Sequence, residues 1–174
     1  MALPIVASRL QIVALDVVMA QSVYANSRDV DNERFLPDEV FESINDARER
    51  IGALVANYGR KDKPLVFAVT LIGKNEQIGH LQAIPGENGW EVGYHIAKAH
   101  TGKGYATEAL EAFLAPAMAY LGLSKINGVC HVDNIASRRV MEKCGFILGF
   151  IGMGCMHGVQ QPLSRYSFEA KSPT

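Results

Sequence analysis

The sequence predicts one α+β domain over residues 1–174, with a mixed, mostly antiparallel central sheet flanked by helices. The main observation is the hydrophobic period, which changes between helical and strand spacing in the order strand, helix, helix, three strands, helix, strand, helix and two strands. A length of 174 residues suits a single compact domain. No internal repeat and no linker rich in Pro, Gly or Ser divides the chain. This order excludes a strictly alternating βαβ fold and a helical bundle.

The N-terminal third is predicted to hold one strand and two helices. The strand is expected over Arg9–Val13. A helix follows from Asp16, which can cap its first turn, and apolar residues recur after it at helical spacing. A longer helix is expected after residues 37–39, because apolar residues recur there at intervals of three and four. Gly59 occupies the place of a C-terminal capping glycine.

The middle of the chain changes to the period of strands and then returns to that of a helix. Three strands are expected over Pro64–Ile72, Ile78–Ile84 and Trp90–Ile96, and the segment PGENG joins the last two as an antiparallel hairpin. An apolar stripe at helical spacing then predicts a helix that starts near Gly104. Pro116 lies inside this helix and should kink it or end its regular part early.

The C-terminal part is predicted to contain a strand, a short helix and two final strands. These cover Lys125–Val132, Asn134–Lys143, Phe146–Met156 and Pro162–Phe168, and residues 170–174 form a loose tail. The stretch Cys144–Ser164 has no formally charged residue, so its length alone could suggest a membrane span. Its five glycines and the sequence Gln160-Gln161-Pro162 instead favour two short buried strands joined by a turn.

Composition and charge argue against several classes of function. The formal net charge is −1, so electrostatics gives no reason to expect nucleic acid or an anionic membrane as a partner. Three scattered cysteines, Cys130, Cys144 and Cys155, predict reduced thiols in a cytoplasmic protein, and none has the paired spacing of a metal site. The apolar N-terminal run contains Arg9 and has no basic region before it, so no signal peptide is expected.

The segment His100–Leu110, HTGKGYATEAL, joins a predicted strand to a predicted helix. Gly102 and Gly104 allow the backbone to approach a ligand closely, and the first N–H groups of the helix lack intrahelical acceptors. With the positive helix end they form a site for a phosphate-type anion, and Lys103 adds one mobile cation at its rim. The alternative interpretation is a glycine-rich turn that only reverses the chain. A P-loop is excluded, because neither Gly-Lys pair is followed by Ser or Thr.

This segment and a second motif further along the chain together resemble a known family. The order EVGYHI, TGKGYATEAL, INGVCHV and NIASRRVMEKCGF resembles the acetyl-CoA-binding half of the GCN5-related N-acetyltransferases (GNAT), and most of all their RimJ/RimL-like branch. The resemblance covers Leu10–Phe168 and is strongest over Glu91–Phe146. It implies a GNAT-like domain in which two splayed strands form an acetyl-CoA cleft. It also implies acetyl transfer from the thioester to a primary amine, a protein N-terminus or a small molecule, by direct attack in a ternary complex.

The resemblance further implies where coenzyme A would bind. Backbone amides of the glycine-rich loop would hold the pyrophosphate, and the end of the strand before it would pair with the pantetheine arm. Asn134 would contact the pantetheine amide, although it could equally be a plain helix cap, and Ser137 would lie near the sulfur or simply be solvated. Thr101 departs from the Gln or Arg of the family pattern. The implied cofactor residues are Ile96, Ala97, Thr101, Gly102, Lys103, Gly104, Tyr105, Ala106, Thr107, Asn134, Ser137 and Arg138.

Acetyl transfer needs a group that accepts the proton of the amine, because an alkylamine has a pKa of about 10.4. Glu91 is the leading candidate, at a position that is often acidic in the family, and the alternative is an ion-paired or solvent-facing strand carboxylate. His80 and His95 rank lower, since strand histidines are more often structural. Met141 stands where many members of the family carry a tyrosine as the general acid. Ser137 would therefore stabilise the thiolate by a hydrogen bond, or a bound water would supply its proton.

Other interpretations stay open at this stage. The main alternative is a non-catalytic module that binds acetyl-CoA as a sensor or structural part, and a further one is a phosphate-binding enzyme of another class. Trp90 and Tyr94 are expected in the core, although one of them could line the acceptor pocket. The acceptor site should be shaped by residues 29–51 and 149–164. The protein is expected to be a monomer or a homodimer, with no metal, nucleic acid or membrane as partner.

Overall fold

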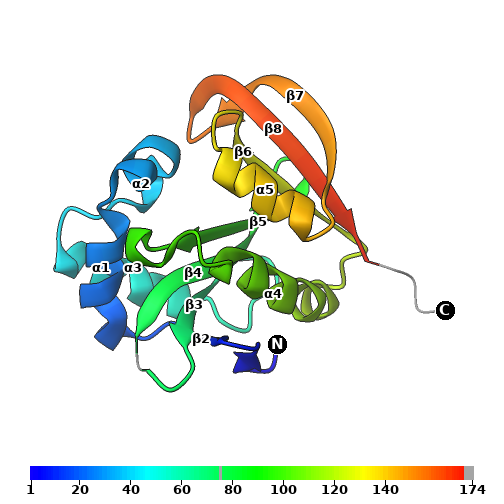
Figure 1. Ribbon diagram of the computed structural model, residues 1–174. Coiled ribbons are helices and arrows are strands. Elements are labelled where there is room, and N and C mark those ends of the chain that lie inside the picture. The colour runs from blue at the N-terminus through cyan, green and yellow to red at the C-terminus, as the bar shows by residue number, and fades with distance from the viewer. Residues whose placement is uncertain (75, 171–174) are drawn as a thin grey trace.

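Figure 1 shows the computed structural model, which describes residues 1–74 and 76–170. Its sheet has eight strands in the order β1-β2-β3-β4-β5-β6-β8-β7, and within the described residues only β5 and β6 are parallel neighbours. The strands are β1 Ile5–Val6, β2 Leu10–Ala14, β3 Leu65–Leu71, β4 Gln77–Gly86, β5 Gly89–Ile96, β6 Lys125–His131, β7 Ile147–Met156 and β8 Val159–Glu169. The helices are α1 Ala20–Ser27, α2 Val30–Phe35, α3 Ile44–Val55, α4 Tyr105–Leu121 and α5 Ile135–Lys143. The predicted α+β class with a mixed, mostly antiparallel sheet is confirmed.

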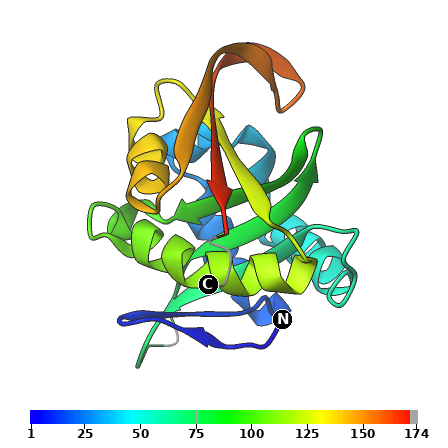
Figure 2. The ribbon, with the colours of Figure 1, turned by 90° about the vertical axis from the view of Figure 1, so that its right-hand side faces the viewer.

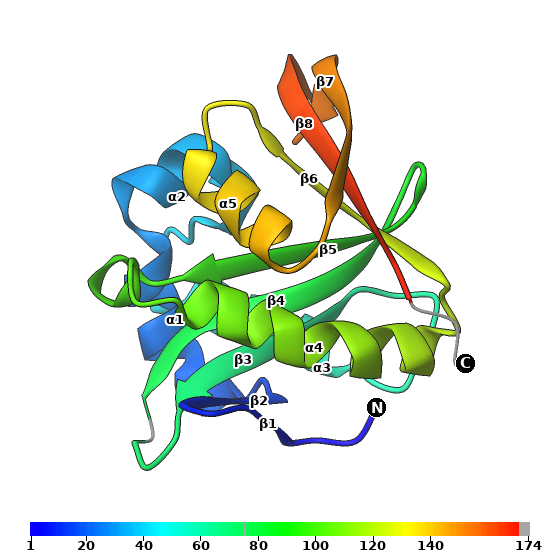
Figure 3. The same cartoon turned by 45° about the vertical axis from the view of Figure 1, so that its right-hand side comes forward.

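Strand β3 separates two hydrophobic cores. Successive side chains of a strand point to opposite faces, so Leu65, Phe67 and Val69 join the large core beneath α4. Val66 and Ala68 face the smaller core that α1 and α3 cover. Figures 2 and 3 show α4 lying across one face of the sheet, while α1 and α3 lie behind it. Burial of both faces explains why this strand is an unbroken apolar run.

The N-terminal third differs from the prediction in its details. Asp16 caps a short 3-10 turn, Val17–Met19, before α1 begins. The predicted start of the second helix is wrong, because Pro37–Glu39 is a separate 3-10 turn and α3 begins at Ile44. Strand β1 and helix α2 were not predicted, since elements of two and six residues are too short to show a period.

The true start of α3 is fixed by a capping box. The Ser43 hydroxyl accepts a hydrogen bond from the Asp46 N–H at 3.1 Å, and the Asp46 carboxylate accepts one from the Ser43 N–H at 3.0 Å. The helix ends at Val55, and Gly59 lies beyond it in a turn with a φ of 89°. Gly59 therefore does not cap the helix, contrary to the prediction.

Helix α4 continues through Pro116 to Leu121, so of the two predicted effects of the proline, an early end of the helix is wrong. A proline in a helix removes one N–H donor and crowds one turn. Here Phe113 and Ala117 are fully buried on either side of it, and this packing holds the helix on the core. The helix ends at Gly122, which has a φ of 70°.

The uncharged stretch near the C-terminus forms the β7–β8 hairpin, as predicted, but the strands are long and β7 is not buried. In the part of the chain that the structure describes, strand β7 pairs with β8 alone and forms one edge of the sheet. Ile147, Ile151 and Met153 expose more than half of their side chains. In the described part of the chain, no helix is long and apolar enough to cross a membrane. The predicted tail lies outside the described residues, apart from Ala170.

Candidate active site

A cleft opens where β5 and β6 separate. The two strands pair only at Glu91 with Asn127 and at Val92 with Gly128, and beyond these pairs they diverge. A cavity of about 650 Å³ fills the gap and is lined by residues 93–96 of β5 and 129–131 of β6. The start of α4, one side of α5 and the short helix α2 complete its walls. The splayed strands that the sequence predicts are therefore present.

The glycine-rich loop forms one end of this cleft. Gly102 and Gly104 have φ values of 74° and 80°, which side chains of L-residues rarely adopt. The first hydrogen bond within α4 runs from the Glu108 N–H to the Gly104 carbonyl, at 3.1 Å. The N–H groups of residues 105–107 therefore have no acceptor within the helix, and their positive end faces the cavity. The loop and helix residues that line the cavity are Thr101, Gly102, Gly104, Tyr105, Ala106 and Thr107.

Arg9 supports this loop from the N-terminal strand region. Its Nε lies 2.7 Å from the Glu108 carboxylate, its Nη1 donates to the Lys103 carbonyl at 3.0 Å, and its guanidinium lies 4.6 Å from the centre of the Tyr105 ring. Burial raises the pKa of Glu108, but the hydrogen bonds and charge of Arg9 outweigh this, so its pKa is lowered on balance. The sequence analysis missed Arg9, because its partners lie almost 100 residues away.

The end of β5 offers a backbone donor to the cleft. The Ala97 N–H donates to the Ile78 carbonyl of β4 at 2.8 Å, and Ile96 stands opposite Gly79. Neighbouring N–H groups in an antiparallel ladder point in alternate directions, so the Ile96 N–H points away from β4. That direction is toward the cleft, so this N–H can donate to a group bound there.

Tyr94 and Ser137 meet across the cleft. The Tyr94 hydroxyl donates to the Ser137 carbonyl at 2.8 Å and lies 2.9 Å from the Ser137 Oγ. Burial raises the pKa of Tyr94, only partly opposed by the hydrogen bond of Ser137. Asn134 caps α5 by accepting the Ser137 N–H at 3.0 Å. The structure thus brings Asn134 and Ser137 together in the cavity, and Tyr94 lines the cleft besides packing on the core.

Three predicted cofactor residues, Ala97, Lys103 and Arg138, do not line the cavity. The Lys103 ammonium donates to the Ala99 carbonyl at 2.9 Å, and the Arg138 guanidinium donates to the Tyr166 hydroxyl at 3.2 Å. The next basic residues of α5, Arg139 and Lys143, line the cavity instead. The sequence analysis named Arg138 in place of these two residues, because spacing along a helix does not by itself show which face meets the cleft.

Glu91 lies in the part of β5 that still pairs with β6. It lines neither this cavity nor the smaller one described next. The pKa of its carboxyl is raised on balance, because burial and the charge of Glu87 outweigh the opposing charge of Arg165. The structure therefore places Glu91 outside the cleft, and its role as the base stays a prediction.

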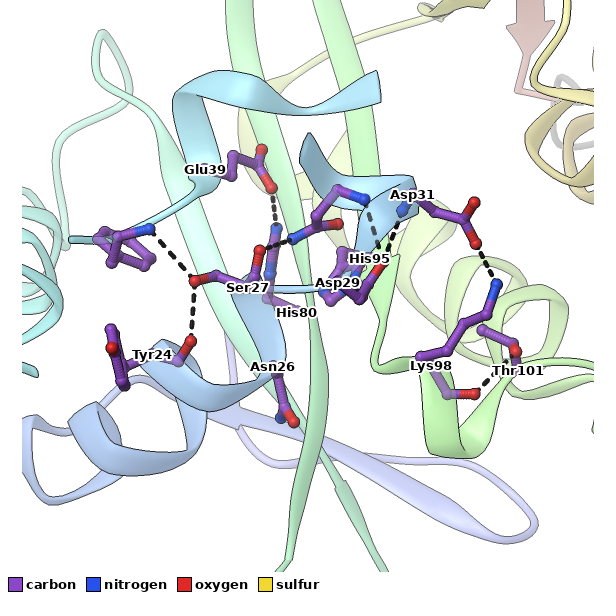
Figure 4. Close-up of polar contacts among 12 residues, drawn as sticks. Tyr24, Asn26, Ser27, Asp29, Asp31, Glu39, His80, His95, Lys98 and Thr101 are labelled. Carbon is purple, nitrogen blue, oxygen red and sulfur yellow. Dashed lines mark hydrogen bonds and ion pairs between the residues drawn. The ribbon is translucent and has the colours of Figure 1, made fainter. Parts of the chain in front are cut away.

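A second cavity of about 370 Å³ lies on the other side of β5, between β4, α1, α3 and the tip of the β7–β8 hairpin. Glu39 lies in it, 3.0 Å from His80 Nε2 and 2.8 Å from Gln82 Nε2 (Figure 4 shows the contact with His80). Burial raises the pKa of Glu39, but the charge and hydrogen bonds of His80 and Gln82 outweigh it and lower the pKa to about 2. At the mouth, His157 Nδ1 meets Asp38 at 2.7 Å and joins the hairpin tip to the N-terminal segment.

Comparison with known proteins agrees with this geometry. The family model described as the acetyltransferase (GNAT) domain matches residues 9–147. An uncharacterized N-acetyltransferase of Bacillus subtilis, YnaD, is 32% identical over 127 residues, which are 72% of this chain and 71% of that protein.

Solved structures are also similar along nearly the whole chain. A GNAT-family acetyltransferase from Bacillus anthracis is 29% identical, with a TM-score of 0.80 over 96% of this chain and 98% of that one. The ribosomal L7/L12 α-N-protein acetyltransferase RimL, in complex with coenzyme A, shares the fold at 19% identity and a TM-score of 0.78, over 96% and 98% of the two chains. The chain belongs to the GNAT family and is an acyltransferase of the N-acetyltransferase type.

Proposed function

We propose that the protein moves an acetyl group from acetyl-CoA to a primary amine by direct attack in a ternary complex. The observation that carries this proposal is the cleft itself, in which a free helix end and the end of a splayed strand face one cavity. The RimL structure with coenzyme A bound has the same fold. A protein N-terminus and a small-molecule amine both remain candidate acceptors.

Coenzyme A would lie between the loop and the diverging strands. The amides of Gly102, Gly104, Ala106 and Thr107 would bind the pyrophosphate, because unpaired N–H groups at a helix start attract anions. The pantetheine arm would run past Ile96 and Asn134 toward Ser137. Thr101 and Tyr105 line the cavity and are further predicted contacts, whereas Ala97, Lys103 and Arg138 do not line it and stay predictions from the resemblance. Arg139 and Lys143 line the cavity and would add cations beside the phosphates.

The chain supplies groups for two steps of the reaction. The Ile96 N–H would stabilise the oxyanion of the tetrahedral intermediate, since a fixed donor aimed at developing charge lowers the barrier. Ser137 would stabilise the departing thiolate by a hydrogen bond. Met141 is fully buried and carries no transferable proton, so it cannot be the acid.

Replacing Gly104 tests the cofactor site. An alanine in its left-handed conformation is strained by about 1–2 kcal/mol and disturbs the free amides. We expect Gly104→Ala to weaken acetyl-CoA binding at least tenfold in titration calorimetry. Gly59→Ala is the matched control, because Gly59 has a similar φ of 89° but lies outside the cleft.

The same preparations distinguish catalysis from mere binding. Release of coenzyme A thiol in the presence of a primary amine supports the transferase. Binding of acetyl-CoA without transfer to any tested amine supports the sensor alternative. An absence of acetyl-CoA affinity in folded wild-type protein would contradict both.

A further inference from the structure

His95 lies at the junction of the two cavities. Among the described residues, only His95 and Asn32 line both of them. His95 directly precedes Ile96, whose N–H faces the cleft, but its side chain points to the opposite face of β5 from Tyr94. That face looks toward α2 and the second cavity. The imidazole is therefore the titratable group between the proposed thioester site and the second cavity.

The neighbours of His95 orient its ring. Asp29 caps α2, and its Oδ1 accepts the N–H groups of Asp31 and Asn32, each at 3.0 Å. Its Oδ2 lies 3.6 Å from His95 Nε2. Figure 4 shows Asp29 beside His95. This carboxylate favours the tautomer with the proton on Nε2, which leaves the lone pair on Nδ1. His80 faces the same ring, with the centres 5.6 Å apart.

Burial keeps His95 neutral, although two of the charged groups around it oppose this. The groups that face it are His80 of β4, Glu39 of the 3-10 turn and Asp29. Burial lowers the pKa of His95 and the charge of His80 adds to this, while Glu39 and Asp29 oppose it, so the pKa is about 4. A neutral imidazole at neutral pH can accept a proton, which an imidazolium cannot.

The second cavity limits what can reach His95. The exposed lining is mainly apolar, and the Asp38–His157 contact closes part of its mouth. A volume of about 370 Å³ suits a compact group rather than an extended chain. The apolar side chains that line it include Leu15, Val23, Phe41, Ile51, Leu54 and Val66.

We propose that His95 accepts the proton of the acceptor amine, and that the amine is carried on a compact apolar group held in the second cavity. The proposal rests on the proposed acetyltransferase function. The amine reacts in its neutral form, after its ammonium proton has passed to solvent. Its nitrogen forms a bond to the acetyl carbon, the bond from that carbon to sulfur breaks, and the N–H proton that becomes acidic in the tetrahedral intermediate moves to His95. The thiolate takes a proton from solvent, with Ser137 hydrogen-bonded to it, and His95 later returns its proton to solvent. Asp29 and His80 are positioning residues.

The test compares the wild-type enzyme with His95→Gln. Acetyl-CoA affinity is measured by titration calorimetry, and transfer by thiol release with 2-phenylethylamine and spermidine as probes. We expect His95→Gln to keep its acetyl-CoA affinity within twofold and to lower kcat by about 10²–10⁴-fold, the range of general base catalysis. We expect kcat/KM for 2-phenylethylamine to exceed that for spermidine at least tenfold.

A pH profile separates proton transfer from a structural role. His80→Gln removes a positive charge beside His95, so the acid limb of kcat/KM should move to higher pH while kcat on the plateau falls less than tenfold. A kcat of His95→Gln within tenfold of the wild type, an unmoved limb or a preference for spermidine each overturns the inference. If His95→Gln does not fold, His95→Asn replaces it. Wild-type protein that binds acetyl-CoA but acetylates neither probe, or that fails to bind it, contradicts the proposed function itself.

Discussion

Tyr94 shows how one side chain can serve both the core and the cleft. Its ring packs against the large core, while its hydroxyl crosses to α5 and bonds to Ser137. The same strand places His95 on its other face, one residue further along. At the residue scale, the alternation of a single strand thus directs one side chain toward α5 and the next toward the second cavity.

The role of the Tyr94 hydroxyl can be measured through stability. Tyr94→Phe removes the donor and leaves the Ser137 carbonyl without this partner, so we expect the free energy of unfolding to fall by about 1–2 kcal/mol. Denaturant unfolding measures the change. Tyr120→Phe is the control, because the Tyr120 ring packs at the edge of the same core, and it should change stability by less than about 0.5 kcal/mol. Equal effects of the two substitutions would show that the hydrogen bonds to Ser137 contribute nothing.

At the element scale, helix α2 and strand β7 stand out, the first because it is short and the second because it is long. Helix α2 has six residues, which is too short to be stable alone, and the Asp29 cap holds its first turn. From there Arg34 reaches Asp133 at 2.8 Å, so α2 joins the segment before α5 across the cleft. Strand β7 is the opposite case, since it is long and its outer edge pairs with no strand among the described residues.

The exposed β7 edge predicts self-association. An edge strand with unpaired backbone groups and exposed apolar side chains is a template for pairing with a second chain. We expect wild-type protein to form a dimer with rising concentration in analytical ultracentrifugation, and Ile151→Lys to shift it to the monomer. Ile72→Lys, at an exposed isoleucine outside β7, should behave like the wild type. A wild-type protein that stays monomeric at every concentration would contradict this prediction.

At the scale of the whole molecule, stability should depend on pH through the half-buried ion pair of Glu39 and His80. The pKa of Glu39 is about 2 in the folded protein against its ordinary value of 4.5. A lowered folded pKa gives stability that is present above pH 4.5 and is lost as the pH falls toward 2. This difference amounts to roughly 3 kcal/mol over that window.

The measurement is urea unfolding of wild type and Glu39→Gln between pH 6 and pH 2. The wild type should lose roughly 3 kcal/mol more than the variant over this range. Glu42→Gln, at an exposed glutamate, is the control and should follow the wild type. Parallel curves for wild type and Glu39→Gln would show that His80 and Gln82 do not stabilise the Glu39 carboxylate.

Features that depend on residues close together in the sequence were predicted better than features that depend on contacts between distant segments. The helix start at Gly104 and the order of the elements other than β1 and α2 depend on neighbouring residues, and both were predicted. The start of α3 was misplaced because several turns share the same helical period, and only the Ser43–Asp46 box selects one. The phase of α5 was misjudged too, since Arg139 lines the cavity and Arg138 does not. The sequence also could not show that Glu91 lies outside the cleft, because a strand pattern does not reveal where two strands separate.

The sequence by itself determined the α+β class, the glycine-rich loop that leads into α4 and the resemblance to the GNAT family. These depend on residue spacing within single segments, where backbone conformation and hydrophobic period act locally. Only the tertiary structure decided that Arg9 supports the loop, that Tyr94 meets Ser137 and that His95 lies between two cavities. Each of these contacts joins elements far apart in the chain, so packing of the whole sheet and its helices brings them together.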